Sequence, residues 1–225
     1  EYRWLDLKKK PIWIHCKGYL VRDDNMKPLY MIGCINEIGE RQKADNVSGL
    51  LGESGFREYM NQLDTPLETG YLLRIGIDHF KEINDNFGQE YGDFVLKKTA
   101  ECISGCTSEG QKVYKLVADE FLILDVASDE AKDADKLYDK VREAIDRFIE
   151  TNEFKVMYTV SGGIVPFAAL KGNQCSEALK LTDFALNEAK KLGRNRCYIF
   201  NGETYRKFLR KREITQELRE AVING

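Results

Sequence analysis

The strongest constraint on the fold of this chain is a mostly apolar run of seven residues, Tyr71–Ile77. It reads Tyr-Leu-Leu-Arg-Ile-Gly-Ile and is bounded by turn-forming residues, which is typical of a strand in the centre of a sheet. A short helix is expected before it, at residues 55–63, and residues 79–104 predict two helices that are broken near Gly88. A central strand with helices on either side of it in sequence indicates an α/β domain.

The segments that follow continue the alternation of strands and helices. Residues 113–126 predict two strands joined by a tight turn, and apolar residues at helical spacing from Ala134 to Phe148 predict a long amphipathic helix. Residues 156–164 predict a strand, residues 176–192 a helix and residues 197–200 a last strand. The order β-αα-ββ-α-β-α-β predicts a layered α/β domain, in which helices pack on a largely antiparallel sheet.

Both ends of the chain depart from this pattern. Residues 1–43 read as strands, in which Pro11–His15 and Gly18–Arg22 flank a short connection and Leu29–Ile35 forms a further apolar strand. Three strands without a helix make a poor independent domain, so we expect them to be the end of a larger one. Residues 203–223 predict a final helix without a core of its own.

Composition excludes some classes of function. The net charge of -3 and the pI near 5.6 provide no basic field, so nucleic acid is not expected as a partner. No apolar run approaches the roughly 18 to 20 residues that cross a bilayer, and no signal peptide is evident. The six cysteines are scattered, without zinc-ligand spacing, as is typical of structural thiols in a reducing compartment. We expect a cytoplasmic location, with a membrane anchor further upstream left open.

Four segments carry the chemistry. They are Ile75-Gly-Ile-Asp-His-Phe-Lys-Glu-Ile-Asn-Asp85, Gly92-Asp-Phe-Val-Leu96, Tyr114-Lys-Leu-Val-Ala-Asp-Glu-Phe121 and Ala189-Lys-Lys-Leu-Gly-Arg-Asn195. Together they resemble the GGDEF family of diguanylate cyclases, whose pattern is I-D-I-D-H-F-K-x-I-N-D, G-D-x-V-L, G-G-[DE]-E-F and A-K-x-x-G-R-N. The resemblance covers residues 45 to about 201 in the correct order and spacing. It implies a cyclase-like palm, a ferredoxin-like layered sheet with helices.

The resemblance also implies a reaction. In the family, two domains face each other as a homodimer and each holds one GTP, and the 3′-hydroxyl of one nucleotide attacks the α-phosphorus of the other. Carboxylates hold Mg²⁺, which activates the attacking oxygen and neutralises charge on the phosphates. GTP, Mg²⁺ and a second copy of the domain are therefore the expected partners.

Site positions follow from the matching motifs. The expected guanine-binding positions are Phe80, Asn84, Asp93 and Leu96, and the expected phosphate-binding cations are Lys190 and Arg194. Asp119 matches the acidic residue that binds metal and assists the reaction, and Glu120 is its acidic neighbour. The backbone of Ile77 is a further expected metal ligand.

Three positions depart from the family pattern. Gly76 stands where the first metal-binding aspartate is expected, so it offers no carboxylate, although Asp78 lies two positions on and could substitute for it. Val117 and Ala118 replace the two glycines of the signature turn. Valine is strongly disfavoured at positive φ, so we expect the turn to change shape or the valine to fill nucleotide space. Together these departures predict an inactive catalytic centre. The family's product-inhibition motif R-x-x-D is also absent at Ser108–Gln111.

These observations predict three regions. Residues 1–43 resemble the end of a PAS sensor domain with a linker to about residue 47. Residues 45–201 are a degenerate GGDEF domain, and residues 202–225 resemble the helix that leads into an EAL phosphodiesterase domain. The function we expect is a GTP-binding regulatory module for that phosphodiesterase. The alternatives are an active diguanylate cyclase that uses Asp78 and Asp119, and a structural dimerisation module that binds no nucleotide.

Overall fold

The computed structural model describes residues 2–5, 11–23, 26–38, 44–63, 67–128, 131–151, 156–172 and 175–224. The chain divides into two compact units, Glu1–Asp45 and Asn46–Gly225. Each unit has its own sheet, and the two are described in turn.

The N-terminal unit contains a three-stranded antiparallel sheet in the order β1-β2-β3. Its strands are β1 (Tyr2–Leu5), β2 (Pro11–Arg22) and β3 (Pro28–Ile38). The expected break within residues 11–22 was wrong. Cys16 and Lys17 pair with Ile35 and Cys34 of β3, so the backbone ladder runs through the expected break, and its register shifts only further on, between Val21 and Arg22.

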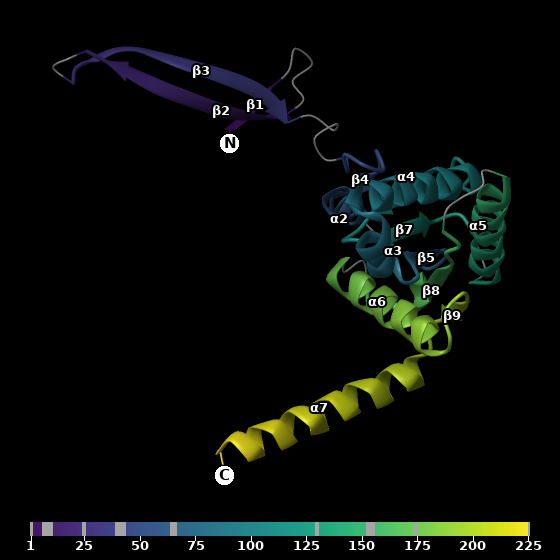
Figure 1. Cartoon of the computed structure of the whole chain (residues 1–225). Coiled ribbons are helices and arrows are strands. Elements are labelled where there is room, and N and C mark those ends of the chain that lie inside the picture. The colour runs from purple at the N-terminus through teal and green to yellow at the C-terminus, as the bar shows by residue number, and fades with distance from the viewer. Residues whose placement is uncertain are drawn as a thin grey trace. The chain divides into compact units, whose positions relative to one another are not determined.

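The second unit contains a six-stranded sheet in the order β4-β6-β7-β5-β8-β9 (Figure 1). Its strands are β4 (Leu51–Gly52), β5 (Tyr71–Ile77), β6 (Gln111–Lys115), β7 (Glu120–Asp125), β8 (Val160–Pro166) and β9 (Cys197–Ile199). β4 pairs with β6 and β8 with β9 in parallel, and the other three pairings are antiparallel. The central position of β5 and the largely antiparallel sheet are thereby confirmed. The two-residue β4 was not predicted, because so short a strand leaves no pattern.

Six α-helices and one short 3₁₀ helix are described in this unit. They are α2 (Glu53–Asn61), α3 (Phe80–Phe87), α4 (Gln89–Cys106), α5 (Ala131–Thr151), η1 (Phe167–Ala169), α6 (Cys175–Lys191) and α7 (Gly202–Asn224). The predicted break between α3 and α4 is confirmed at Gly88, whose φ of +84° favours glycine. Within the described ranges, no helix is both long enough and apolar enough to cross a membrane.

Helices cover both faces of this sheet. Side chains of β5 alternate between the faces: Tyr71, Leu73, Ile75 and Ile77 pack in the core formed with α3, α4 and α5, whereas Leu72 packs with residues of α2 and α6. Figure 1 shows α4 and α6 on opposite sides of β5 and β7. Alternate residues of a strand point to the same face of the sheet. Arg74 and Gly76 therefore lie on the same face as Leu72, which is the face that α6 covers.

Candidate functional site

A pocket of about 500 Å³ lies where α3 and α4 meet the turn that precedes β7. It is lined by Phe80, Lys81, Asn84, Gln89, Asp93, Leu96, Ala118 and Asp119. The four positions expected to bind guanine therefore come together, and Asp119 stands at the same pocket. Lys81 and Gln89 also line it and were not predicted as site residues, although Lys81 matches the lysine of the first motif.

Close packing of α3 on α4 forms this pocket. A Cβ added to Gly92 would overlap Oδ1 of Asn84, so a side chain at this point would displace the amide of Asn84 from its place in the pocket. Leu96 of the same helix is 7 % exposed, and its side chain gives the pocket an apolar surface. Among the described residues, the buried Oδ1 of Asn84 has no hydrogen-bond donor, which costs free energy in the isolated domain.

The signature turn at Val117–Glu120 is a tight hairpin connection. The amide of Glu120 donates to the carbonyl of Val117 (3.2 Å), and that of Leu116 donates to the carbonyl of Glu120 (2.8 Å). Ala118 is the residue of the turn with left-handed backbone, at φ +54°. Val117 is 69 % exposed and does not line the pocket. Val117 therefore has no positive φ, and the left-handed strain falls on Ala118. The expectation that the turn changes shape or that Val117 fills nucleotide space stays a prediction.

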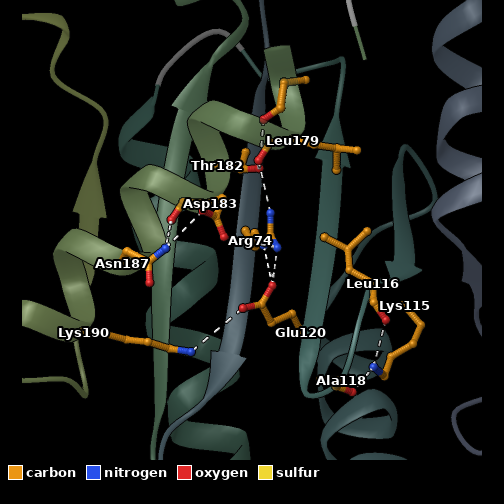
Figure 2. A network of polar contacts seen from close by, with 11 residues as sticks. Arg74, Lys115, Leu116, Ala118, Glu120, Leu179, Thr182, Asp183, Asn187 and Lys190 are labelled. Carbon is orange, nitrogen blue, oxygen red and sulfur yellow. Dashed lines mark hydrogen bonds and ion pairs between the residues drawn. The ribbon is translucent and has the colours of Figure 1, made fainter. Parts of the chain in front are cut away.

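Lys115 holds this turn from within the protein. Its buried ammonium donates to the carbonyl oxygens of Leu116 (3.1 Å) and Ala118 (Figure 2). The ammonium also lies over the ring of Phe121. A lysine buried in this way compensates the carbonyl groups that the turn leaves without backbone partners. The role was not predicted, because β6 contains two lysines and the sequence does not show which of them is buried.

Glu120 lies on the α6 face of the sheet and is bound by an arginine. Nε of Arg74 donates to Oε2 of Glu120 at 2.7 Å, and a second guanidinium nitrogen contacts the same oxygen (Figure 2). The two side chains are 11 % and 18 % exposed. Arg74 also donates to the carbonyl of Leu179 (3.1 Å) and lies 3.5 Å from the carboxylate of Asp183, both in α6. The negative charge of Glu120 is thus compensated within the protein.

Gly76 pairs with Glu120 across β5 and β7. A Cβ at this position would lie 3.1 Å from Nζ of Lys190 and 3.1 Å from Cδ2 of Leu186. The same ammonium lies 4.0 Å from Oε1 of Glu120. The side chain of Lys190 thus borders the space into which an aspartate at position 76 would project.

Asp78 has a different environment from the one that a metal ligand needs. It is 3 % exposed, and its carboxylate accepts hydrogen bonds from the hydroxyls of Thr159 (2.7 Å) and Ser161 (2.7 Å) and from the amide of Asn195 (3.1 Å). It does not line the pocket that contains Asp119. Asp78 therefore anchors the turn that follows α6.

The remaining predicted residues lie near the edges of this arrangement. Arg194 is exposed on the turn after α6, with left-handed backbone at φ +62°. Neither Arg194 nor Lys190 lines the pocket that contains Asn84. The amide of Ile77 donates to the carbonyl of Asp119 (3.3 Å), which places the two backbones side by side. Burial raises the pKa of Asp119 above its usual value, and the nearby Lys190 partly opposes this.

The fold and the grouping of these residues agree with the comparison to known families. The family described as "Diguanylate cyclase, GGDEF domain" matches residues 43–196. This chain belongs to the GGDEF family.

Relatives of this GGDEF domain have different names and activities. The cyclic di-GMP phosphodiesterase NbdA of Pseudomonas aeruginosa is 28 % identical over 183 residues, which are 79 % of this chain and 23 % of NbdA. The diguanylate cyclase DgcZ of Escherichia coli is 30 % identical over 161 residues, 70 % of this chain and 53 % of DgcZ. This chain therefore spans roughly a quarter to a half of the length of these curated relatives.

The fold is also found in solved structures. The GGDEF domain of TpbB (YfiN) from Pseudomonas aeruginosa superposes with a TM-score of 0.64 at 24 % identity, covering 74 % of this chain and 99 % of that one. The GGDEF domain of DgcB from Caulobacter crescentus, solved with c-di-GMP, gives 0.61 at 23 % identity, covering 70 % and 95 %. These similarities establish the fold.

The carboxylates of this GGDEF domain do not fit Mg²⁺ in the way that the family resemblance implies. Gly76 has no side chain, Glu120 is paired with Arg74, and Asp78 is occupied by three donors. In the described part of the chain, no group of three or more histidine, cysteine, aspartate or glutamate side chains is placed to hold a metal ion. Of the side chains expected to hold the metal, Asp119 alone keeps a carboxylate at the pocket, and Mg²⁺ there would take its other ligands from nucleotide phosphates and water.

Proposed function

We propose that this GGDEF domain is a GTP-binding regulatory module that makes no cyclic-di-GMP and controls a downstream EAL phosphodiesterase. The observation that carries the proposal is a division of the site. The guanine-side residues line one pocket, whereas Glu120, expected to be catalytic, is paired with Arg74 on the other face of the sheet.

The pocket offers the groups that guanine requires. A carboxylate such as that of Asp93 can accept two N–H donors from the guanine edge, and the amide of Asn84 can both donate and accept. Adenine presents a different donor and acceptor pattern, so it leaves such a carboxylate without two donors. Leu96 and Phe80 add apolar surface for the base. We therefore expect GTP to bind more tightly than ATP.

Synthesis of cyclic-di-GMP requires more than this pocket. Attack of a 3′-hydroxyl on an α-phosphorus depends on metal ions that activate the oxygen and stabilise charge on the phosphates. Gly76 provides no carboxylate and Glu120 carries a compensating arginine, so the proposed module binds the nucleotide without converting it.

A packed path leads from the site to the C-terminal helix. Two side chains of α6 face the site: Lys190 lies near Glu120, and Asp183 lies near Arg74. Phe184, next to Asp183, is buried against Tyr205 and Phe208 of α7, with ring centroids 4.9 Å and 5.2 Å apart. A nucleotide phosphate that attracts Lys190 would shift α6, and the aromatic cluster would pass that shift to α7. We propose α7 as the connection to the EAL domain and residues 1–43 as the end of a PAS domain, so that signals enter and leave at opposite ends of the chain.

Calorimetric titration with GTP tests the nucleotide binding. We expect one saturable event, weakened at least tenfold by Asn84→Ala and by Asp93→Asn. Glu90→Gln is the matched control: it removes the same charge from α4, but Glu90 does not line the pocket. No binding at millimolar GTP would contradict the proposal, and concentration-dependent self-association would then favour the dimerisation module. Loss of affinity in the control would also contradict it.

A further inference from the structure

We infer that two protein cations, Arg74 and Lys190, take the place of the divalent metal in this GGDEF domain, so that the nucleotide binds without Mg²⁺. The inference rests on the proposed GTP binding, and it adds that GTP binds as the free nucleotide and not as its Mg²⁺ complex. It follows from three features of the α6 face.

The first feature is the position of the lysine ammonium. Nζ of Lys190 would be 3.1 Å from a Cβ at position 76 and is 4.0 Å from Glu120. These distances place a positive charge beside the position where an aspartate would hold a metal. The ammonium of Lys190 would repel a dication at the same position, because the two charges would be close together and poorly screened by solvent.

The second feature is the state of Glu120. Arg74 covers one carboxylate oxygen with two guanidinium nitrogens, and Lys190 lies near the other (Figure 2). A metal bound to the other oxygen of Glu120 would lie close to both the guanidinium and the ammonium, which would repel it.

The third feature is the arrangement of the phosphate path. Asp119 lines the pocket, and the ammonium of Lys190 lies 4.0 Å from the carboxylate of the next residue, Glu120. A phosphate chain that leaves the pocket past Asp119 therefore meets this ammonium. Because Arg74 compensates Glu120, the glutamate does not oppose the approach of the phosphates. Uncomplexed GTP carries two more negative charges than its Mg²⁺ complex, so it is attracted more strongly.

The most direct test uses Mn²⁺ alone with the wild-type chain. Electron paramagnetic resonance of free Mn²⁺ should show no saturable one-to-one binding. Binding that is lost in Glu120→Gln or Asp119→Asn would overturn the inference. The double variant Arg74→Leu/Gly76→Asp removes the arginine and adds a carboxylate, so it should gain Mn²⁺ binding if its far-UV circular dichroism shows that it folds. A folded double variant that fails to bind Mn²⁺ counts against the inference.

GTP titrations in Mg²⁺ and in EDTA provide the second test with the wild-type chain. The affinity in EDTA should equal or exceed that in Mg²⁺, and Lys190→Gln should weaken it at least tenfold. Binding that is tenfold or more tighter in Mg²⁺ would overturn the inference. An absence of GTP binding under both conditions would refute the proposed function instead, and the Mn²⁺ measurement would still decide whether protein cations exclude the metal.

Discussion

Arg74 of β5 and Glu120 of β7 form an ion pair on the α6 face of the sheet, in which two guanidinium nitrogens contact one carboxylate oxygen, with an Nε–Oε2 distance of 2.7 Å. The pair holds the second acidic residue of the signature away from the pocket that contains the first, Asp119. Two adjacent carboxylates that are expected to act together are thereby divided between two environments. This division is the physical basis for expecting an inactive domain.

Restoration of the missing aspartate should not restore synthesis. The carboxylate introduced by Gly76→Asp would lie beside the ammonium of Lys190, since Nζ is 3.1 Å from the Cβ position. The new side chain would form an ion pair, and Arg74 would still occupy Glu120. We expect no cyclic-di-GMP from this variant with GTP and Mg²⁺ when products are separated by chromatography. Product formation by the single variant would show that neither cation blocks the metal.

The Arg74–Glu120 pair should show strong energetic coupling. Arg74→Met alone leaves a poorly exposed carboxylate without its main partner, and Glu120→Gln alone leaves the guanidinium without a full charge to face. A double-mutant cycle by urea denaturation should give a coupling free energy of about 1–3 kcal/mol. Additivity within about 0.3 kcal/mol would mean that the pair contributes no more than an exposed one.

Ala118→Gly should stabilise the domain. Ala118 adopts φ +54°, a region that costs L-residues roughly 1–2 kcal/mol, and glycine removes this strain at some cost in chain entropy. We expect a net gain of about 0.5–1 kcal/mol in the free energy of unfolding. Val117→Gly is the control, because Val117 has no left-handed strain to relieve, and it should destabilise. Equal effects of the two substitutions would contradict the assignment of strain to Ala118.

Gly92→Ala should abolish nucleotide binding and destabilise the domain. The added methyl would overlap Oδ1 of Asn84, so the Asn84 side chain would have to leave its position in the pocket. We expect a loss of about 1–3 kcal/mol in the free energy of unfolding. Gly105→Ala in the same helix meets nothing within 4 Å and should instead stabilise by about 0.4–1 kcal/mol. Thermal denaturation of both variants, with GTP titration of each, distinguishes them.

The stability contribution of Asp119 should depend on pH. Burial raises its pKa in the folded state, so the folded protein holds this proton more tightly than the unfolded chain does. Protonation therefore favours folding below the ordinary aspartate pKa of about 3.9, and the advantage disappears as pH rises through the folded-state value. We expect Asp119→Asn to raise the melting temperature at pH 7, with the difference shrinking as pH falls. An unchanged difference between pH 4 and pH 7 would contradict this.

The sequence predicted the order of elements in the second unit because its helices and strands are long and strongly periodic. The main strand β5, the two helices around Gly88 and the long helix α5 were found in this way. The two-residue β4 left no pattern, and the strand at β8 begins at Val160 rather than Val156 because residues 156–159 join no ladder.

The site was predictable where motifs fix residue types, and not where it depends on distant partners. Phe80, Asn84, Asp93 and Leu96 line one pocket as expected. Arg74 could not be assigned a role, because its partner lies 46 residues further along the chain. The left-handed conformation of Ala118 was not predicted, because the sequence shows which residues form a turn, but not which of them adopts that conformation.

The central claim is that this GGDEF domain binds GTP without converting it. The most direct measurement incubates the chain with GTP and Mg²⁺, separates the protein from free nucleotide and identifies what remains bound and what is released. We predict that intact GTP is retained, with neither cyclic-di-GMP nor pyrophosphate formed. Formation of both products, at a rate that Asp119→Asn abolishes, would contradict the account and establish an active diguanylate cyclase.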